Sequence, residues 1–168
     1  MKVDRREVEL RLLRFRDAAR ATGIKLTHQR LEIFREVAAS IEHPAAEAIF
    51  RAVQERIPTV SLDTVYRTLW TLEELGLVAT LGPRGGTSRF DANLRPHHHF
   101  VCVRCGLTRD FEDSAFDALQ VPAVVRHYGD VLGARVELRG MCRKCLTRAA
   151  ASTRRGRAKR AKERRNVK

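Results

Sequence analysis

The sequence contains no uninterrupted apolar run near the roughly 18 residues that a membrane-spanning helix needs. Its N-terminus, MKVDRREVELRLLRF, mixes charged and apolar residues and lacks the apolar block of a secretory signal peptide. These two absences predict a soluble protein of the cytoplasm. Cysteines are kept reduced there, so we expect the four cysteines to bind a metal rather than form disulfides.

Acidic residues are scarce, because 20 Asp and Glu stand against 33 Lys and Arg and leave a net charge of +13. Residues 148–168 hold ten Lys and Arg but one acid, Glu163, so this segment carries +9 and the remainder +4. The segment also has almost no apolar residues. We expect a disordered basic tail that binds phosphates of nucleic acid; a tail that only aids solubility is the alternative.

The 168 residues, 43% of them hydrophobic, suffice for one ordinary domain or two small ones. Apolar residues spaced by three and four predict four helices in the first half. Their inward residues are Val8, Leu12, Phe15 and Ala19; Leu31, Phe34, Val37 and Ile41; Ile49, Ala52, Val53 and Ile57; and Val65, Leu69, Leu72 and Leu75. The residues expected to begin or end these helices are Gly23, Thr27, Pro44, Pro58, Ser61 and Gly76.

Two apolar stretches, residues 77–81 and 88–90, flank the glycine-rich segment GPRGGT and predict a hairpin. Helices followed by a hairpin form a winged helix-turn-helix. The outer face of the fourth helix carries hydroxyls and a guanidinium that suit contacts to phosphates and base edges in a major groove. The expected DNA contacts are Ser61, Thr64, Tyr66 and Arg67, with Thr68 and Thr71 on or near the same side. An ordinary solvated helix face is the alternative.

The second half changes to alternating β-forming patterns in HHFVCVR, LTRDFE and VLGARVELRG. Between them, Phe116, Leu119 and Val124 have helical spacing that Pro122 interrupts. The fold class is therefore α+β, with an N-terminal winged helix-turn-helix and a small C-terminal α/β domain. The predicted divisions are residues 1–90 for DNA binding, 91–96 as linker, 97–147 for metal binding and 148–168 as tail.

Two cysteine pairs, Cys102-x-x-Cys105 and Cys142-x-x-Cys145, each have the spacing that brings two thiolates to one metal. Four thiolates in a tetrahedron match zinc, which needs no redox change. The sequence therefore predicts one structural Zn²⁺ that connects the first strand of the domain to its end. Four reduced cysteines without metal, or a redox pair, are the weaker alternatives.

Three consecutive histidines precede the first cysteine pair. In a strand, His97 and His99 point to one face and His98 to the other. Two histidines alone do not make a functional metal site, so structural or incidental histidines remain the alternative. Asp91, Asp110 and His43 could supply more ligands, but distance along the chain cannot show that they converge.

The motifs LTHQRLEIF, HPAAEAIF, SLDTVYRTLWTLEELGLV, TSRFD, HHHFVCVRCG and GMCRKC occur in an order that resembles the ferric uptake regulator family of metal-dependent bacterial repressors. The resemblance covers residues 18–146 and is greatest to the peroxide-sensing branch, because aspartates stand where the iron-sensing branch usually has glutamates. It implies a C-terminal dimerisation domain and a homodimer bound to double-stranded operator DNA.

The resemblance also implies a regulatory Fe²⁺ or Mn²⁺ in each subunit. Its ligands would be His43, Asp91, His97, His99 and Asp110. Peroxide would oxidise His43 or His97 in an iron-dependent reaction, and loss of the metal would release DNA. For a further metal site of many relatives the chain offers His98 and Asp117, but that site is not expected because residues 133–136 contain neither histidine nor acid. His28 and His127 are expected to be structural or solvated.

Two alternatives to the peroxide-sensing repressor remain open at this stage. The first is a repressor of the same build that reports the availability of iron, manganese or zinc. The second is a metal-dependent hydrolase that uses the histidine and aspartate residues. The predicted helix-turn-helix, the basic tail and the lack of a separate base weigh against the hydrolase, so no enzyme activity is expected.

Overall fold

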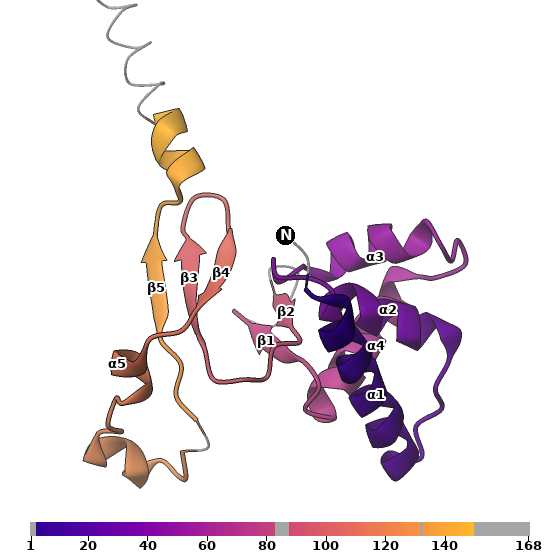
Figure 1. Ribbon diagram of the computed structural model, residues 1–168, viewed down its shortest axis with the longest axis horizontal. Helices are drawn as coiled ribbons and strands as arrows, with labels where there is room; N and C mark the ends of the chain where they lie inside the picture. The colour runs from indigo at the N-terminus through magenta and orange to yellow at the C-terminus, as the bar shows by residue number, and fades with distance from the viewer. Residues whose placement is uncertain (1–2, 83–87, 132, 150–168) are drawn as a thin grey trace, which may run out of the picture. The chain divides into compact units, whose positions relative to one another are not determined.

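The computed structural model describes residues 3–82, 88–131 and 133–149 of the 168-residue chain. The chain divides into two compact units, Met1–Pro96 and His97–Lys168, which we call the N-terminal unit and the C-terminal unit. Figure 1 shows the long helices in the first unit and a three-stranded sheet in the second. Among the described residues, no helix combines the length and the apolar character needed to cross a membrane.

The N-terminal unit contains the four predicted helices, α1 (Arg5–Thr22), α2 (His28–Ala38), α3 (Ala46–Gln54) and α4 (Leu62–Glu74). Thr27 and Ser61 cap α2 and α4 as expected, because each side chain accepts a hydrogen bond from the backbone N–H three residues later. Gly23 ends α1 in the left-handed conformation, with φ of 72°. These local signals fix where the helices begin and end.

Two helix boundaries differ from the prediction near His43. α2 ends at Ala38, which leaves Ile41 outside the helix, and Pro44 precedes Ala45, the N-cap of α3. Between the two helices, His43 has a positive φ of 49°, which a right-handed helix does not accommodate. The segment between the helices is therefore a loop, and this loop presents His43.

The core of the N-terminal unit lies among the four helices and the first hairpin. Its fully buried large side chains include Leu12, Phe15, Ile33, Phe34, Ile49, Val53, Val65, Leu69, Leu72 and Phe90. Phe15 and Phe34 meet edge to face, with ring centroids 5.2 Å apart. The predicted inward residues of the helices thus form one continuous apolar cluster, which Ile41 and Ala52 do not join.

The predicted hairpin consists of β1 (Ala79–Leu81) and β2 (Arg89–Asp91), which pair antiparallel with Ala79 opposite Asp91. The helices and this hairpin make a winged helix-turn-helix (Figure 1). Asp91, which the sequence pattern assigned to the linker, is the last residue of β2. The glycine-rich tip at residues 83–87 lies outside the described residues.

The C-terminal unit is built on a sheet with strand order β4-β3-β5. The strands are β3 (His98–Cys102), β4 (Thr108–Phe111) and β5 (Glu137–Gly140), and they coincide with the three predicted β-forming stretches. β3 pairs antiparallel with β4 and parallel with β5. This confirms an α+β fold in which β3, the strand of the histidines and first cysteines, is central.

The predicted helix between β4 and β5 is wrong as a continuous element. It is replaced by the short α5 (Ser114–Asp117) and the 3-10 helix η1 (Ala123–His127). Pro122 precedes η1 and cannot donate a backbone hydrogen bond, so the chain breaks there. Leu119 and Val124 are more than half exposed instead of buried. Most of the predicted basic tail, residues 150–168, lies outside the described residues.

Candidate metal centre

The four cysteines converge at one end of the sheet in the C-terminal unit. Cys102 ends β3, and the parallel register of β3 and β5 pairs Cys102 with Gly140, which brings Cys142 alongside. The four Sγ atoms lie within 4.8 Å of one another, and the Sγ atoms of Cys105 and Cys142 are 3.7 Å apart. Sulfurs at zinc's usual bond length in a tetrahedron are roughly 3.8 Å apart. The four thiols therefore fit one zinc ion.

The protonation chemistry of this set also suits a cation. The backbone N–H of Cys142 donates to Cys102 Sγ at 3.3 Å and lowers the pKa of Cys102 to about 6. Burial raises the pKa of Cys145 to about 12, with the neighbouring sulfurs adding to the rise. One thiol is thus prepared to ionise while another resists, chiefly because burial disfavours its charged form. A divalent cation removes that conflict and releases the remaining protons.

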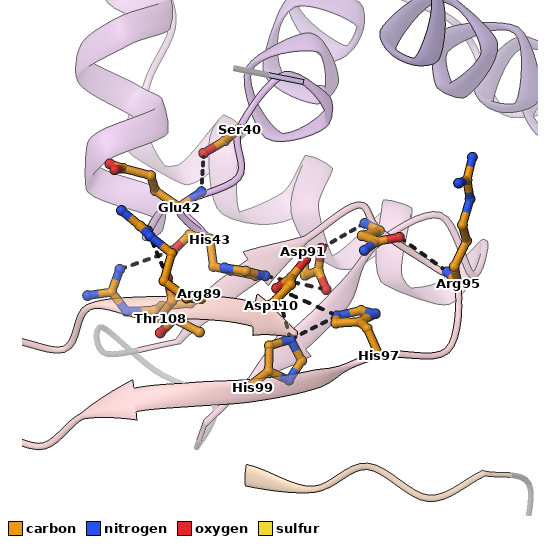
Figure 2. A network of polar contacts seen from close by, with 12 residues as sticks. Ser40, Glu42, His43, Arg89, Asp91, Arg95, His97, His99, Thr108 and Asp110 are labelled. Atoms are coloured by element: carbon orange, nitrogen blue, oxygen red, sulfur yellow. Dashed lines mark hydrogen bonds and ion pairs between the residues drawn. The ribbon is translucent and has the colours of Figure 1, made fainter. Parts of the chain in front are cut away.

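In the N-terminal unit, His43 and Asp91 come together although 48 positions separate them in the sequence. His43 Nε2 lies 3.6 Å from Asp91 Oδ2, and both side chains are buried. The backbone brings this about, because Phe90 N–H donates to Pro44 O at 3.1 Å and Arg89 Nη1 donates to His43 O at 3.1 Å. Figure 2 shows Arg89 beside the loop of His43. The loop before α3 is thereby attached to β2, which ends in Asp91.

In the C-terminal unit, His97, His99 and Asp110 form a second set, which we call the triad. His99 and Asp110 are directly opposite each other in the β3–β4 pair, so their side chains share a face. His97 Nε2 is 2.9 Å from His99 Nε2, and Asp110 Oδ1 is 3.8 Å from the first and 3.6 Å from the second. The three side chains point toward one another in Figure 2.

The distances within the pair and within the triad suit a metal ion. Nitrogen and oxygen ligands about 2.1 Å from one ion are roughly 3 to 3.5 Å apart. The observed separations, from 2.9 Å to 3.8 Å, lie close to that range. Imidazoles and carboxylates without a thiolate favour Fe(II) or Mn(II), whereas four thiolates favour zinc. The chain therefore carries two donor sets of different chemistry.

The residues expected to contact DNA lie at the N-terminal half of α4. Arg67 is exposed and its guanidinium forms an ion pair with Asp63 at 2.9 Å, while Thr64 is half-buried beside the capping Ser61. The Tyr66 hydroxyl donates to Glu47 on α3 at 2.9 Å, which raises the pKa of that tyrosine. No sequence signal predicted this contact, which directs the Tyr66 hydroxyl toward α3.

Thr68 differs from the prediction that it lies on the outer face. Its side chain is buried, with 2% exposed, and its hydroxyl donates to Thr64 O at 2.8 Å. Hydrogen bonding to the preceding helical turn satisfies a buried threonine without a partner from outside the helix. Thr71 makes the equivalent bond to Arg67 O at 2.9 Å and stays half-buried.

The remaining histidines divide between surface and interior. His28 and His127 are exposed, as the sequence predicts for solvated residues. His98 is buried with 2% of its surface exposed, on the face of β3 opposite to the triad. The sequence pattern predicted no role for His98, and alternation within the strand was the only signal that separated it from its neighbours.

Comparisons with known proteins agree with this arrangement. Residues 21–138 match the ferric uptake regulator family. A peroxide-responsive repressor, PerR, of Staphylococcus epidermidis is 34% identical over 128 residues, which are 75% of this chain and 84% of that protein. A PerR of Staphylococcus aureus is 32% identical over 145 residues, 86% of this chain and 98% of that protein. These relatives bear out the resemblance to the peroxide-sensing branch.

Solved structures show the same fold. The Helicobacter pylori ferric uptake regulator superposes with a TM-score of 0.70 at 22% identity, covering 87% of this chain and 97% of that one. The Pseudomonas aeruginosa regulator, described with manganese, superposes with a TM-score of 0.60 at 31% identity, covering 76% of this chain and 97% of that one. With its motifs, its winged helix and its two donor sets, the chain belongs to the ferric uptake regulator family.

Proposed function

We propose that the protein is a dimeric, metal-dependent transcriptional repressor of the cytoplasm that releases operator DNA when peroxide oxidises a ligand histidine. The observation that supports the proposal is that each unit by itself brings nitrogen and oxygen donors together. His43 and Asp91 belong to the winged-helix unit, and the triad belongs to the C-terminal unit. A metal bound by both would connect DNA binding to the state of the site.

The proposed regulatory site combines the pair and the triad around one Fe(II) or Mn(II). The chain itself favours this, because Asp91 and His97 are six positions apart and an extended stretch of that length spans at most about 20 Å. Three imidazoles and two carboxylates would leave one of six octahedral positions open. The structural zinc would be held separately by Cys102, Cys105, Cys142 and Cys145.

Bound iron would activate peroxide by transient electron transfer and be regenerated, because the two electrons that reduce the peroxide come overall from the imidazole. In the overall reaction, one peroxide oxygen is added to a carbon of a ligand imidazole and the other leaves as water. His43 and His97 are the histidines proposed to react. An oxidised imidazole is a poorer ligand, so the metal leaves and the two units lose their connection. Manganese would support repression but would not drive the oxidation.

DNA binding would use α4 as the recognition helix, with Ser61, Thr64, Tyr66 and Arg67 toward the groove. Ser61 and Arg67 are exposed, which supports this role. Because its hydroxyl is bonded to Glu47, Tyr66 would contact DNA through its ring edge. Direct contacts of this kind determine the register of the protein on the duplex.

Dimerisation would use the C-terminal unit, which exposes more apolar surface than a solvated domain requires. Leu119 and Val124 are more than half exposed, Tyr128 is 84% exposed and Leu138 is 43% exposed. Leu138 also belongs to β5, which forms one edge of the three-stranded sheet and leaves backbone groups available for pairing. A two-fold dimer would cover this surface and present two winged helices to two half-sites.

The basic tail would bind phosphates without adding base specificity. Removing residues 154–168 should flatten the dependence of DNA affinity on salt, since the slope falls by about 0.9 for each phosphate that is no longer neutralised. Preference for the operator over random DNA should stay the same. Binding measured at several salt concentrations tests this, and an unchanged slope would show that the tail does not bind phosphates.

The decisive experiment loads the purified protein with Fe(II) or with Mn(II) and then adds low peroxide. In the iron form we expect one added oxygen on the peptide of His43 or His97 by mass spectrometry, together with loss of operator binding. The manganese form should show no change in mass and should stay bound to operator DNA.

Unmodified histidines and retained operator binding in the iron form would contradict peroxide sensing. That outcome would favour a repressor reporting metal availability, a second candidate supported by the Pseudomonas aeruginosa relative described with manganese. Turnover of nucleotide or ester substrates by the metal-loaded protein would contradict both, since no enzyme activity is proposed.

A further inference from the structure

Both ring nitrogens of His98 lie close to polar groups of the C-terminal unit, although among the described residues only Nδ1 forms a hydrogen bond. The backbone N–H of Val136 donates to Nδ1 at 3.3 Å, and Nε2 lies 3.2 Å from Asp117 Oδ1 on α5. A backbone amide can only donate, so Nδ1 is the acceptor and the ring proton of neutral His98 is on Nε2, toward the carboxylate. In this arrangement neither nitrogen has a lone pair left for a metal.

The His98 ring is also held by aromatic contacts. Phe111 is directly opposite His98 in the β3–β4 pair, with ring centroids 5.5 Å apart, and Phe116 of α5 lies 5.4 Å away at 82°. Phe111 and Phe116 contact each other as well, at 5.9 Å. Edge-to-face packing of this kind favours a single ring orientation. His98 thus connects β3, α5 and the residue before β5.

Val136 connects this arrangement to the triad. Its N–H donates to His98, and its carbonyl accepts the backbone N–H of His99 at 3.0 Å. The imidazole of His98 and the backbone of His99 are therefore both held by one residue. Because side chains alternate along a strand, fixing His98 on one face of β3 determines the direction of His99 on the other, and His97 directly precedes the strand.

We propose that His98 is a positioning residue and not a ligand: with Val136 and Asp117 it forms a clamp that aims His97 and His99 at the regulatory metal. This inference rests on the regulatory site proposed above. The clamp does without a metal because the Val136 amide occupies the lone pair of Nδ1 and the protonated Nε2 faces the Asp117 carboxylate. It orients ligands in the way that hydrogen-bonded partners behind a metal ligand do, and such partners contribute about 10- to 100-fold in affinity.

The test compares variants of the full chain that separate the parts of the clamp. His98→Phe keeps a ring between Phe111 and Phe116 but removes both polar contacts. His98→Asn keeps an acceptor for the Val136 amide. We expect Mn(II) affinity to fall about tenfold in H98F and to be largely restored in H98N. His127→Phe, at an exposed histidine, is the matched control and should bind Mn(II) like the wild type.

Two measurements distinguish positioning from a general loss of structure. Zinc content should stay at one ion per chain in every variant, and the amide of Val136 should exchange faster only where its acceptor is lost. For NMR, diamagnetic Zn(II) can replace Fe(II) or Mn(II) at the regulatory site. The imidazole nitrogens of the wild type should show His98 protonated at Nε2 both before and after this second metal ion is added. This second readout does not depend on peroxide or DNA.

The outcomes that would overturn the clamp are distinct. Wild-type affinity in H98F with normal zinc content would show that His98 does not position the triad. A metal-dependent change at the His98 nitrogens, with one metal fewer bound in H98F, would make His98 a ligand. Failure of the wild type to bind Mn(II) at all would overturn the proposed regulatory site, and with it the role of the clamp.

Discussion

The two units differ in what holds them together. The N-terminal unit buries a continuous cluster of large aliphatic and aromatic side chains from four helices and a hairpin. In the described part of the C-terminal unit, the buried hydrophobic residues are Cys102, Cys142 and Cys145, with Phe100 and Leu107 packed against them. One unit has an ordinary apolar core, and the other has a sulfur cluster in its place.

This difference shows how the fold divides stability between two sources. Burial of apolar side chains stabilises the N-terminal unit by roughly 1.5 to 3 kcal/mol for each large residue. A domain with so little buried apolar surface needs a metal or a partner instead. The C-terminal unit has the donor set for a metal and an exposed apolar surface for a partner. Each of the following predictions perturbs one side of this comparison.

The largest effect is expected from loss of a zinc ligand. Cys145→Ala should abolish zinc binding and unfold the C-terminal unit, because structural zinc contributes on the order of 10 kcal/mol to such domains. The N-terminal unit should stay folded on its own core. Elemental analysis for zinc and amide hydrogen exchange, read separately for residues 3–82 and 98–149, would measure both effects.

His99→Ala is the matched control, because it removes a proposed metal ligand from the same unit but from the other donor set. It should keep zinc and the exchange protection of the C-terminal unit. A cysteine variant that loses zinc yet keeps full protection in β3 and β5 would contradict a metal-dependent fold.

A core truncation tests the other side of the comparison. Leu69 is fully buried on α4, and Leu69→Ala should destabilise the N-terminal unit by about 2 to 5 kcal/mol through reduced burial and a cavity. Leu13→Ala makes the same change at a residue that is 49% exposed and should cost less than about 0.5 kcal/mol. Denaturant unfolding measures both, and zinc content should be normal in each. Equal destabilisation by the two variants would contradict the assigned core.

The sequence predicted the elements of the N-terminal unit well because their signals are local. Helix periodicity, the caps at Thr27 and Ser61 and the glycine at residue 23 act within a few positions along the chain. The prediction failed at Ile41 and Pro44, which lie in a loop between α2 and α3 that contains the positive φ of His43. The contacts that hold that loop come from Arg89 and Phe90, which are distant in sequence.

The metal ligands were predictable to different degrees for the same reason. Cysteine spacing alone indicated the zinc set, since both pairs carry a recognised pattern. The histidines and aspartates required the family resemblance, because convergence of residues from separate elements leaves no local signal. The continuous helix expected after β4 failed because the C-terminal unit has little apolar core against which a helix could pack.

The proposed regulatory site is part of neither the apolar core nor the zinc-binding cysteine cluster. A substitution at Asp91 tests whether the site can be removed without loss of stability. Asp91 Oδ1 accepts the N–H of Asn93 at 2.7 Å, and Asp91→Asn keeps that acceptor while removing the charge. We expect Mn(II) affinity to fall about 100-fold, since a direct ligand should matter at least as much as the partners behind ligands. Calorimetric titration of the zinc-loaded protein measures this.

Asp130→Asn is the control, because Asp130 is exposed and its loss changes net charge equally. It should leave Mn(II) affinity unchanged. The unfolding of the metal-free N-terminal unit should be nearly the same in D91N and the wild type. A large loss of stability in D91N without an effect on Mn(II) would make Asp91 a structural residue.

The smallest effect is expected at the surface of the N-terminal unit, where Glu7 joins three segments. It accepts from Arg11 at 3.0 Å and from Arg95 at 3.1 Å, and Arg11 also donates to Ala38 O at the end of α2. The hydrogen bond from Arg11, helped by nearby arginine charges, lowers the pKa of Glu7 below its usual 4.5. Because the pKa of Glu7 is lower in the folded chain, the unfolded chain binds the proton more readily. The stabilisation by the ionised Glu7 is therefore fully present at pH values above the pKa of Glu7 in the unfolded chain. It is lost as the pH falls through the lower folded value.

Glu7→Gln should therefore destabilise the N-terminal unit by about 1 kcal/mol at neutral pH, near the lower end for charged hydrogen bonds because Glu7 is partly exposed. The difference from the wild type should shrink below the usual pKa of a glutamate and vanish once Glu7 is protonated. Urea unfolding of the zinc-loaded protein at a series of pH values measures it, with Glu9→Gln on the exposed face of α1 as control. A difference that does not change with pH would show that Glu7 acts through packing instead of charge. The contribution of Glu7 to stability is small beside that of the apolar core, because water replaces the partners of an exposed charge at little cost in free energy.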